Sequence, residues 1–203
     1  YLNKGNLTFE DITEKSGLKA EGWCYGIAVV DINQDGYQDF YICKSGNKNT
    51  PASQRRNYFF INNGLSPSPE GQGRGEVTST ESAAKMGLDD DGYDVQAAFF
   101  DYDKDGDLDM YLMRNSFVSY NRNNAREMKS DMETSSTTDK LFRNDGPVVS
   151  LPSGGRKGGF TDVSKEAGIT IEGFGLGVAV CDINKDNWPD VYVSNDFITS
   201  DLV

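Results

Sequence analysis

One short segment of the chain has the spacing of a cation-binding loop. The segment "DYDKDGDLD" places Asp101, Asp103 and Asp105 at loop positions 1, 3 and 5 and Asp109 at position 9. This spacing directs several carboxylate oxygens at one point, with the backbone carbonyl of Asp107 at position 7 as a further ligand, which is how proteins cage a hard cation such as Ca²⁺. Without a cation, the same charges would repel one another strongly.

Two other segments repeat this spacing. Each offers a side-chain oxygen at positions 1, 3, 5 and 9 and a backbone carbonyl at position 7, because asparagine at position 3 still supplies a carbonyl oxygen. The predicted calcium ligands are Asp31, Asn33, Asp35, Tyr37 and Asp39 in the first loop, and Asp182, Asn184, Asp186, Trp188 and Asp190 in the third. Position 6 is a glycine in the first two loops and Asn187 in the third, where asparagine tolerates a left-handed backbone.

The loops differ from EF-hand loops at position 12. An EF-hand requires a bidentate glutamate there, whereas this chain has Ile42, Leu112 and Val193. A single loop of this kind is weak support for a metal site, because solvated Asp-rich turns also occur. Three loops in register favour about three bound Ca²⁺ ions, and Mg²⁺ fits less well because it prefers few protein ligands and retained water.

The loops belong to a unit that is copied three times. Residues 26–43, 96–113 and 177–194 align without a gap, each as an apolar run, an aspartate loop and a second apolar run. Segments predicted to form a short strand and a helical turn ending at glycine precede each copy. A period of this size indicates a repeat architecture in which each unit buries its faces against its neighbours.

Each unit is predicted to contain four short strands. In the first unit these lie at 26–31, 39–43, 57–62 and 76–80, where the patterns are alternating or continuously apolar. Four-stranded sheets repeated at this length are typical of β-propeller blades, and closed propellers use roughly four to eight of them. We therefore predict an all-β fold that covers about three blades of a larger propeller. Its expected divisions are 1–10 as the end of an upstream blade, then 11–80, 81–163 and 164–203 as successive repeats.

Composition excludes several classes of function. The chain has 32 acidic and 20 basic residues, a net charge of -12, which argues against a nucleic-acid partner. It has no histidine, which excludes histidine-based catalysis and His-ligated metal sites in these 203 residues. No run of 18 apolar residues is present, so no transmembrane segment is expected.

The three cysteines form no CxxC pair, so neither a zinc knuckle nor a thioredoxin-type motif is expected. Cys24 and Cys43 flank one predicted strand pair and can either form a disulfide in an oxidising compartment or serve as small apolar core residues. Cys181 follows the apolar run "GVAV" and is expected to be a buried free thiol.

The repeated pattern resembles the FG-GAP/VCBS repeat family, whose calcium-bound propeller blades also occur in integrin α heads. The segments "YNRNNAREMKSD", "KLFRNDG" and "YVSNDF" resemble bacterial surface VCBS proteins related to cartilage acidic protein, of the ASPIC/UnbV type. This resemblance implies a seven- or eight-bladed calcium propeller outside the cytoplasm that binds proteins or glycans. The sequence departs from the family's Gly-rich strand start at Asp94, Val95 and Gln96.

Two long loops are candidates for partner binding. They span Lys44 to Asn57 and Arg114 to Asp139 and place basic and aromatic side chains on an otherwise acidic protein. These residues are Arg55, Arg56, Phe117, Tyr120, Arg122, Arg126 and Lys129. They predict a contact surface for a glycan or an acidic protein, and the alternative is a pair of solvated insertions.

Two classes of function follow. The first is a calcium-stabilised extracellular or cell-surface scaffold that binds a protein or glycan without catalysis, on the bacterial outer surface and with an outer-membrane assembly as one setting. The second is the propeller domain of a calcium-dependent polysaccharide lyase or hydrolase, which would need a base other than histidine. Because the phased carboxylates are assigned to calcium, the sequence favours binding over catalysis.

Overall fold

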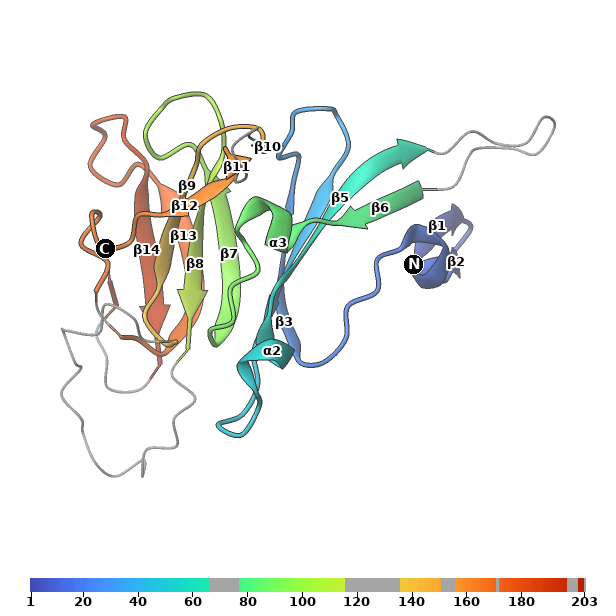
Figure 1. The fold of residues 1–203 in the computed structure, drawn as a ribbon, viewed down its shortest axis with the longest axis horizontal. Coiled ribbons are helices and arrows are strands. Elements are labelled where there is room, and N and C mark those ends of the chain that lie inside the picture. The colour runs from blue at the N-terminus through green and yellow to red at the C-terminus, as the bar shows by residue number, and fades with distance from the viewer. Residues whose placement is uncertain (66–76, 116–135, 151–155, 171, 197–200, 203) are drawn as a thin grey trace.

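The computed structural model describes residues 1–65, 77–115, 136–150, 156–170, 172–196 and 201–202. Within these ranges the protein consists mainly of antiparallel strands, which confirms the predicted all-β class (Figure 1). The helices are single turns, α1 (Thr13–Ser16), α2 (Ala52–Arg55) and α3 (Ala83–Met86). No helix in the described ranges is long and apolar enough to cross a membrane.

Two four-stranded antiparallel sheets form the centre of the protein. The first has the order β3 (Cys24–Val30), β4 (Asp39–Lys44), β5 (Tyr58–Leu65) and β6 (Val77–Glu81). The second has the order β7 (Asp94–Phe100), β8 (Asp109–Arg114), β9 (Lys140–Asn144) and β12 (Phe160–Asp162). All four strands predicted for the first repeat are therefore confirmed, and the majority of their ends agree with the prediction to within about two residues.

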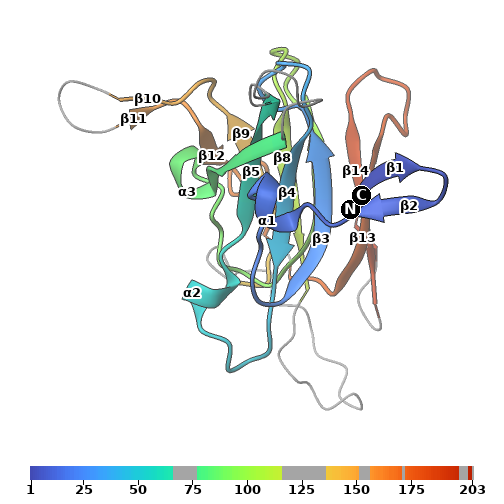
Figure 2. The same ribbon diagram turned by 90° about the vertical axis from the view of Figure 1, so that its right-hand side faces the viewer.

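Two-stranded sheets lie at either end of the described chain. Near the C-terminus, β13 (Gly175–Cys181) pairs with β14 (Asp190–Asn195), and Leu202 forms an isolated bridge to Val193 of β14. Near the N-terminus, β1 (Leu2–Gly5) pairs with β2 (Thr8–Glu10). A small hairpin of β10 (Val149–Ser150) and β11 (Arg156–Lys157) extends from the second sheet (Figure 2).

The sheets pack face to face in chain order. Strand β3 packs against β7, and β7 packs against β13 (Figures 1 and 2). Tyr41 and Phe59 of the first sheet meet Met110 and Leu112 of the second in one apolar cluster. Tyr111 and other residues on the opposite face of the second sheet meet the third sheet in another. Successive side chains of β8 thus enter opposite cores, as the alternation along a strand requires.

Two of the three predicted helical turns form as helices, and the third, at residues 164–168, is a turn that ends at the left-handed Gly168. Helix α1 ends at Gly17 and α3 ends at Gly87, both with a left-handed backbone, at φ 73° and 84°. Glycine is favoured at this C-terminal position because it has no Cβ to clash in the left-handed conformation. Helix α3 follows the hairpin of β5 and β6, the third and fourth strands of the first sheet, and α1 follows the hairpin of β1 and β2.

The cysteines are all free thiols. Cys43 is fully buried in the first core, as the apolar alternative predicted, whereas Cys24 is exposed. The prediction that Cys181 is buried is wrong, because this thiol is exposed. Cys181 ends β13 at odd spacing from Val178, which packs toward the second sheet, so its side chain points to the other face.

Candidate metal-binding loops

The three aspartate loops occupy equivalent places in the fold. They join β3 to β4, β7 to β8 and β13 to β14, so all lie at the same end of the packed sheets. Neighbouring loops touch: Gln34 Nε2 donates to the backbone oxygen of Gly106 at 3.2 Å, and Lys104 Nζ lies 3.8 Å from the centre of the Trp188 ring. The repeats thus place three candidate cation sites side by side.

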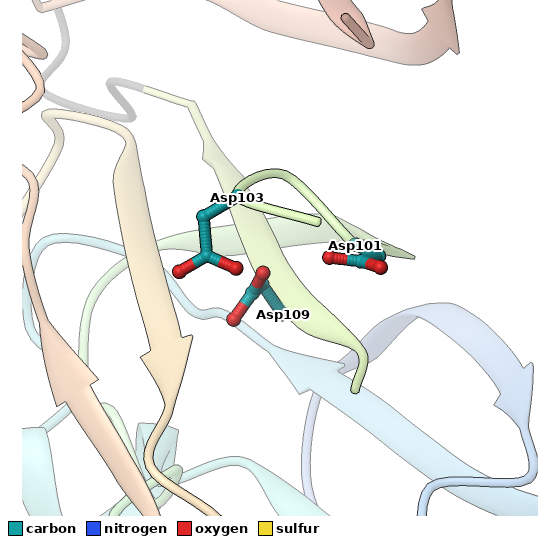
Figure 3. Close-up of side chains that lie close together, drawn as sticks. All are labelled: Asp101, Asp103 and Asp109. Carbon is teal, nitrogen blue, oxygen red and sulfur yellow. The ribbon is translucent and has the colours of Figure 1, made fainter. Parts of the chain in front are cut away.

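The second loop brings three carboxylates together. One oxygen from each of Asp101, Asp103 and Asp109 lies within 4.8 Å of the others (Figure 3). Among the described residues, this is the only group of three or more Asp, Glu, His or Cys side chains with ligand atoms this close. Asp109 is fully buried at the start of β8, whereas Asp101 and Asp103 are partly exposed. Solvent therefore reaches the group from the side of Asp101 and Asp103.

Each loop is held by the same hydrogen bonds from backbone N–H groups to its own carboxylates. The carboxylate at position 1 accepts from the N–H groups of positions 5 and 6, at 3.0 and 2.8 Å for Asp31, 3.1 and 3.1 Å for Asp101, and 3.1 and 2.8 Å for Asp182. The carboxylate at position 5 accepts from the N–H of position 7 in all three loops. Local hydrogen bonds therefore orient the side chains before any ligand binds.

In the first two loops, the carboxylate at position 9 connects the loop to the third strand of its sheet. Asp39 accepts from the N–H groups of Ile32 and Asn62 at 3.0 and 2.8 Å, so it joins the loop to the third strand. Asp109 does the same with Tyr102 and Asn144, at 3.0 and 2.8 Å. This residue is therefore both a candidate ligand and the anchor of the loop.

The loop backbone requires two left-handed residues. Position 4 is left-handed in each loop, with φ of 56°, 63° and 64° at Gln34, Lys104 and Lys185. Position 6 is also left-handed, with φ of 70° at Asn187. The third loop therefore keeps the same turn without glycine, as the tolerance of asparagine for this conformation predicted.

Electrostatic strain concentrates in the second loop. Burial, together with the charges of Asp103 and Asp105, raises the pKa of Asp109 to about 6, although two N–H donors oppose the rise. Burial and the charges of Asp105, Asp109 and Asp103 raise the pKa of Asp107 to about 6, and its Oδ1 is buried without a hydrogen-bond partner. A cation would relieve this repulsion, because opposite charge favours the ionised carboxylates.

The structure thus places all fifteen predicted ligand residues in three equivalent loops, but it gathers three acidic side chains closely only in the second. The first and third loops have asparagine at position 3, and this amide donates to the carboxylate at position 5, at 2.9 Å in both Asn33 and Asn184. Two of the potential ligands are therefore bonded to each other.

Sequence reasoning missed a second repeated contact, at the opposite end of the sheets. Before the third strand of each four-stranded sheet, an Asp or Asn accepts the N–H of the last residue of the second strand and bonds the tyrosine of that strand. Asn57 accepts from Lys44 N at 2.7 Å and donates to Tyr41 Oη at 2.8 Å. Asp139 accepts from Arg114 N at 2.7 Å and from Tyr111 Oη at 2.8 Å. The tyrosine repeats two residues after position 9, and this signal could have revealed the contact.

Asp201 makes the equivalent contact in the third repeat. It accepts from the N–H of Asn195 at 2.8 Å and also bonds the hydroxyl of Tyr192. Asp201 therefore corresponds to Asn57 and Asp139, and Leu202 corresponds to the first residue of a third strand.

A buried ion network, also missed, lies beside this contact in the second repeat. Arg114 bonds Asp90, bonds Asp94 at 2.8 Å, and donates to the carbonyl oxygen of Thr138 at 3.1 Å. Asn57 of the first sheet donates to Asp94 at 2.7 Å, so the network joins two repeats. The unexpected Asp94 at the start of β7 is thus the partner of Arg114, its cross-strand neighbour.

The proposed partner-binding loops are described only in part. Arg55 was expected in a contact surface, but it is buried, donates to the carbonyl oxygens of Asp91 and Gly92, and stacks on Tyr93. That expectation is wrong, because Arg55 joins the first repeat to the second. Arg56 is exposed and paired with Asp89. The other candidates lie outside the described residues: Phe117, Tyr120, Arg122, Arg126 and Lys129.

No protein-family model matches the chain, and no curated protein matches it either. The interpretation of the loops therefore depends on their geometry and on their threefold repetition. Oxygen-only donor sets with several carboxylates are suited to hard divalent cations rather than to thiophilic metals.

Proposed function

We propose that the protein is a calcium-stabilised β-propeller scaffold at the cell surface or outside the cell, with one Ca²⁺ in each aspartate loop. The observation that carries this proposal is the second loop, where three carboxylates converge and a fourth has a buried oxygen without a partner. Repulsion among these carboxylates destabilises the ion-free protein. A bound cation would remove the repulsion and add its binding free energy to the stability of the fold.

The donor set favours Ca²⁺ over Mg²⁺. The loops offer four side-chain oxygens and one carbonyl each, and Ca²⁺ accepts six to eight oxygen ligands in a flexible arrangement. Mg²⁺ demands near-octahedral geometry and retains its waters. Sites of this kind in extracellular modules bind with a Kd of roughly 10⁻⁴–10⁻³ M, which matches a calcium-rich exterior.

The proposed role is binding rather than catalysis. The clustered carboxylates of the loops are assigned to Ca²⁺, and Asp90, Asp94 and Asp139 are bonded to neighbouring protein groups. The sheets would act as successive blades that carry loops for a protein or glycan partner, with an outer-membrane assembly as one setting. Propeller-like scaffolds commonly place recognition on such loops, because loops tolerate variation while the sheets remain fixed.

Thermal unfolding tests the metal sites directly. We expect the midpoint to rise in excess Ca²⁺ relative to EDTA, and Mg²⁺ with a calcium-selective chelator to restore little of the rise. Isothermal titration should give about three Ca²⁺ per chain. Asp103→Ala should lose one of these sites, whereas Asp91→Asn, outside the loops, should lose none. Equal midpoints in Ca²⁺ and EDTA would show that the loops are solvated turns.

A further inference from the structure

The three aspartate loops differ in the number of carboxylates that they carry. The second loop has aspartate at positions 1, 3, 5, 7 and 9, whereas the first and third have it at positions 1, 5 and 9 only. Position 3 is Asn33 in the first loop and Asn184 in the third, and position 7 is Tyr37 and Trp188. The affinity of a Ca²⁺ site depends on the number of charged ligands and on the rigidity of the site. The three loops are therefore not equivalent as cation sites.

The first and second loops have the same framework. Both join the first two strands of a four-stranded sheet. In both, the carboxylate at position 1 accepts from the N–H groups of positions 5 and 6. In both, the carboxylate at position 9 accepts from the N–H of position 2 and from an N–H of the third strand. A difference in affinity between these two loops must therefore come from the side chains that differ.

Position 3 changes the surroundings of the carboxylate at position 5. In the first loop, Asn33 Nδ2 donates to Asp35 Oδ2 at 2.9 Å. The third loop has the same bond from Asn184, also at 2.9 Å, so a cation in either loop competes with an amide for this carboxylate. In the second loop position 3 is Asp103, whose ionised carboxylate has no hydrogen to donate. A cation in the second loop therefore displaces no such bond and meets one more negative charge.

Position 7 adds a further carboxylate to the second loop. Asp107 Oδ1 is buried without a hydrogen-bond partner. The carboxylates of Asp105, Asp109 and Asp103 lie close enough for their charges to act on this side chain. A buried acceptor in such surroundings is unfavourable unless a donor or a cation satisfies it. Because Tyr37, the equivalent residue of the first loop, has no charge, this indication of a positive ligand is specific to the second loop.

Lysine side chains oppose a cation in the third loop. Lys104, at position 4 of the second loop, extends to the neighbouring loop, where its Nζ lies 3.8 Å from the centre of the Trp188 ring. The third loop also has Lys185 at its own position 4, whereas the first loop has the neutral Gln34 there. Ammonium groups near the third loop would repel a divalent cation.

We propose that the second loop binds Ca²⁺ first, the first loop second and the third loop last. This order rests on the proposed function and deepens it by naming the residues that set the affinity of each site. Asp103 and Asp107 strengthen the second site, and Lys104 and Lys185 weaken the third. The first loop, with three carboxylates and no lysine, is intermediate.

The order makes the two outer loops the calcium-responsive part of the fold. The second sheet contributes to both apolar clusters, one shared with the first sheet and one with the third. An ion retained in the second loop therefore stabilises the sheet on which both neighbours pack. The first and third loops would fill only where Ca²⁺ reaches about 10⁻⁴–10⁻³ M, as in extracellular surroundings.

Calorimetric titration of the chelator-treated full chain with Ca²⁺ tests the order. We expect one site that binds at least about tenfold more tightly than the other two, because affinity rises with the number of charged ligands. Three equal sites would overturn this proposal and leave the proposed function standing. No binding at all would overturn the proposed function and this proposal with it.

Exchange of single residues between the loops assigns the tight site. Asp103→Asn copies position 3 of the first loop and should weaken the tight site at least about fivefold, and Asn33→Asp should strengthen one weak site by a similar factor. Asp91→Asn, outside the loops, is the matched control and should leave the isotherm unchanged. Circular dichroism reports whether each variant folds. A tight site that is unchanged in folded Asp103→Asn would overturn the assignment.

Terbium luminescence reports on the third loop separately. Tb³⁺ occupies calcium sites made of oxygen donors and emits when a nearby tryptophan transfers energy to it, and Trp188 lies within the third loop. With excitation selective for tryptophan, we expect emission only after the tighter sites have filled. Trp188→Phe should abolish this emission, whereas Trp23→Phe, next to the end of β3 that is remote from the aspartate loop, should preserve it. Full emission with the first equivalent of Tb³⁺ would contradict the order.

Discussion

The Arg114 network offers a quantitative test of how two repeats are joined. The substitution Arg114→Met keeps most of the side-chain length but removes the cation from Asp94, which is fully buried, and from Asp90, whose side chain is 9% exposed. Breaking a buried ion pair on one side costs about 3–5 kcal/mol, because the remaining charge is left without compensation. We expect a loss of this size in the free energy of unfolding at about pH 8.

The loss should depend on pH. Burial raises the pKa of Asp94 to about 7 even though Arg114 lowers it, so the carboxyl of the variant should titrate higher still. Burial also raises the pKa of Asp90, but Arg114 and Lys140 outweigh this effect and lower it to about 2. A carboxyl whose pKa is raised in the folded protein stabilises the fold at low pH, and this stabilisation is lost as the pH rises through the raised pKa. The cost of Arg114→Met should therefore shrink to about 2 kcal/mol near pH 5, where Asp94 is protonated.

The chain supplies its own matched control. The third repeat has Gly175 and Asn195 as the cross-strand pair that corresponds to Asp94 and Arg114. The double variant Asp94→Gly with Arg114→Asn should therefore cost less than Arg114→Met, because the charges of Arg114 and Asp94 are removed together and the remaining Asp90 keeps its ion pair with Lys140.

Urea unfolding in excess Ca²⁺, at about pH 8 and about pH 5, measures these differences. A loss below about 1 kcal/mol for Arg114→Met at the higher pH would refute the network as a stabilising link. A double variant less stable than the single would refute the reasoning about uncompensated charge.

Three further predictions concern the second loop. Asp101→Asn should remove one Ca²⁺ from the calorimetric stoichiometry and leave the other sites, whereas an unchanged stoichiometry would argue against this ligand. Asp107→Asn should stabilise the protein in EDTA near pH 7 by about 1–2 kcal/mol. The pKa of Asp107 is raised to about 6, so ionisation of this carboxyl above that pH destabilises the folded protein, and asparagine cannot ionise. Urea unfolding would contradict this if the variant were less stable. Gly106→Ala, at φ 98°, should cost about 1–2 kcal/mol in the same assay, and the equivalent Gly36→Ala, at φ 87°, should cost a similar amount.

Local patterns predicted the parts of the fold that depend on neighbouring residues. The strands of the first repeat, the helical turns ending at Gly17 and Gly87 and the left-handed Asn187 all follow from a few consecutive residues. The nine-residue loops are predictable for the same reason, because their internal hydrogen bonds join residues at most seven apart. Ca²⁺ itself stays a prediction.

The sequence by itself determined the repeat, the four-strand pattern of its units and the positions of the carboxylates, because periodicity and loop spacing are short-range properties. Only the tertiary structure decided which distant groups meet, whether within one repeat or between two. The contact of Asn57 with Asp94 joins residues 37 apart, and that of Lys140 with Asp90 joins residues 50 apart. Burial was decided in the same way, as Arg55 and Cys181 show, because the exposure of a side chain depends on which sheet packs against its face.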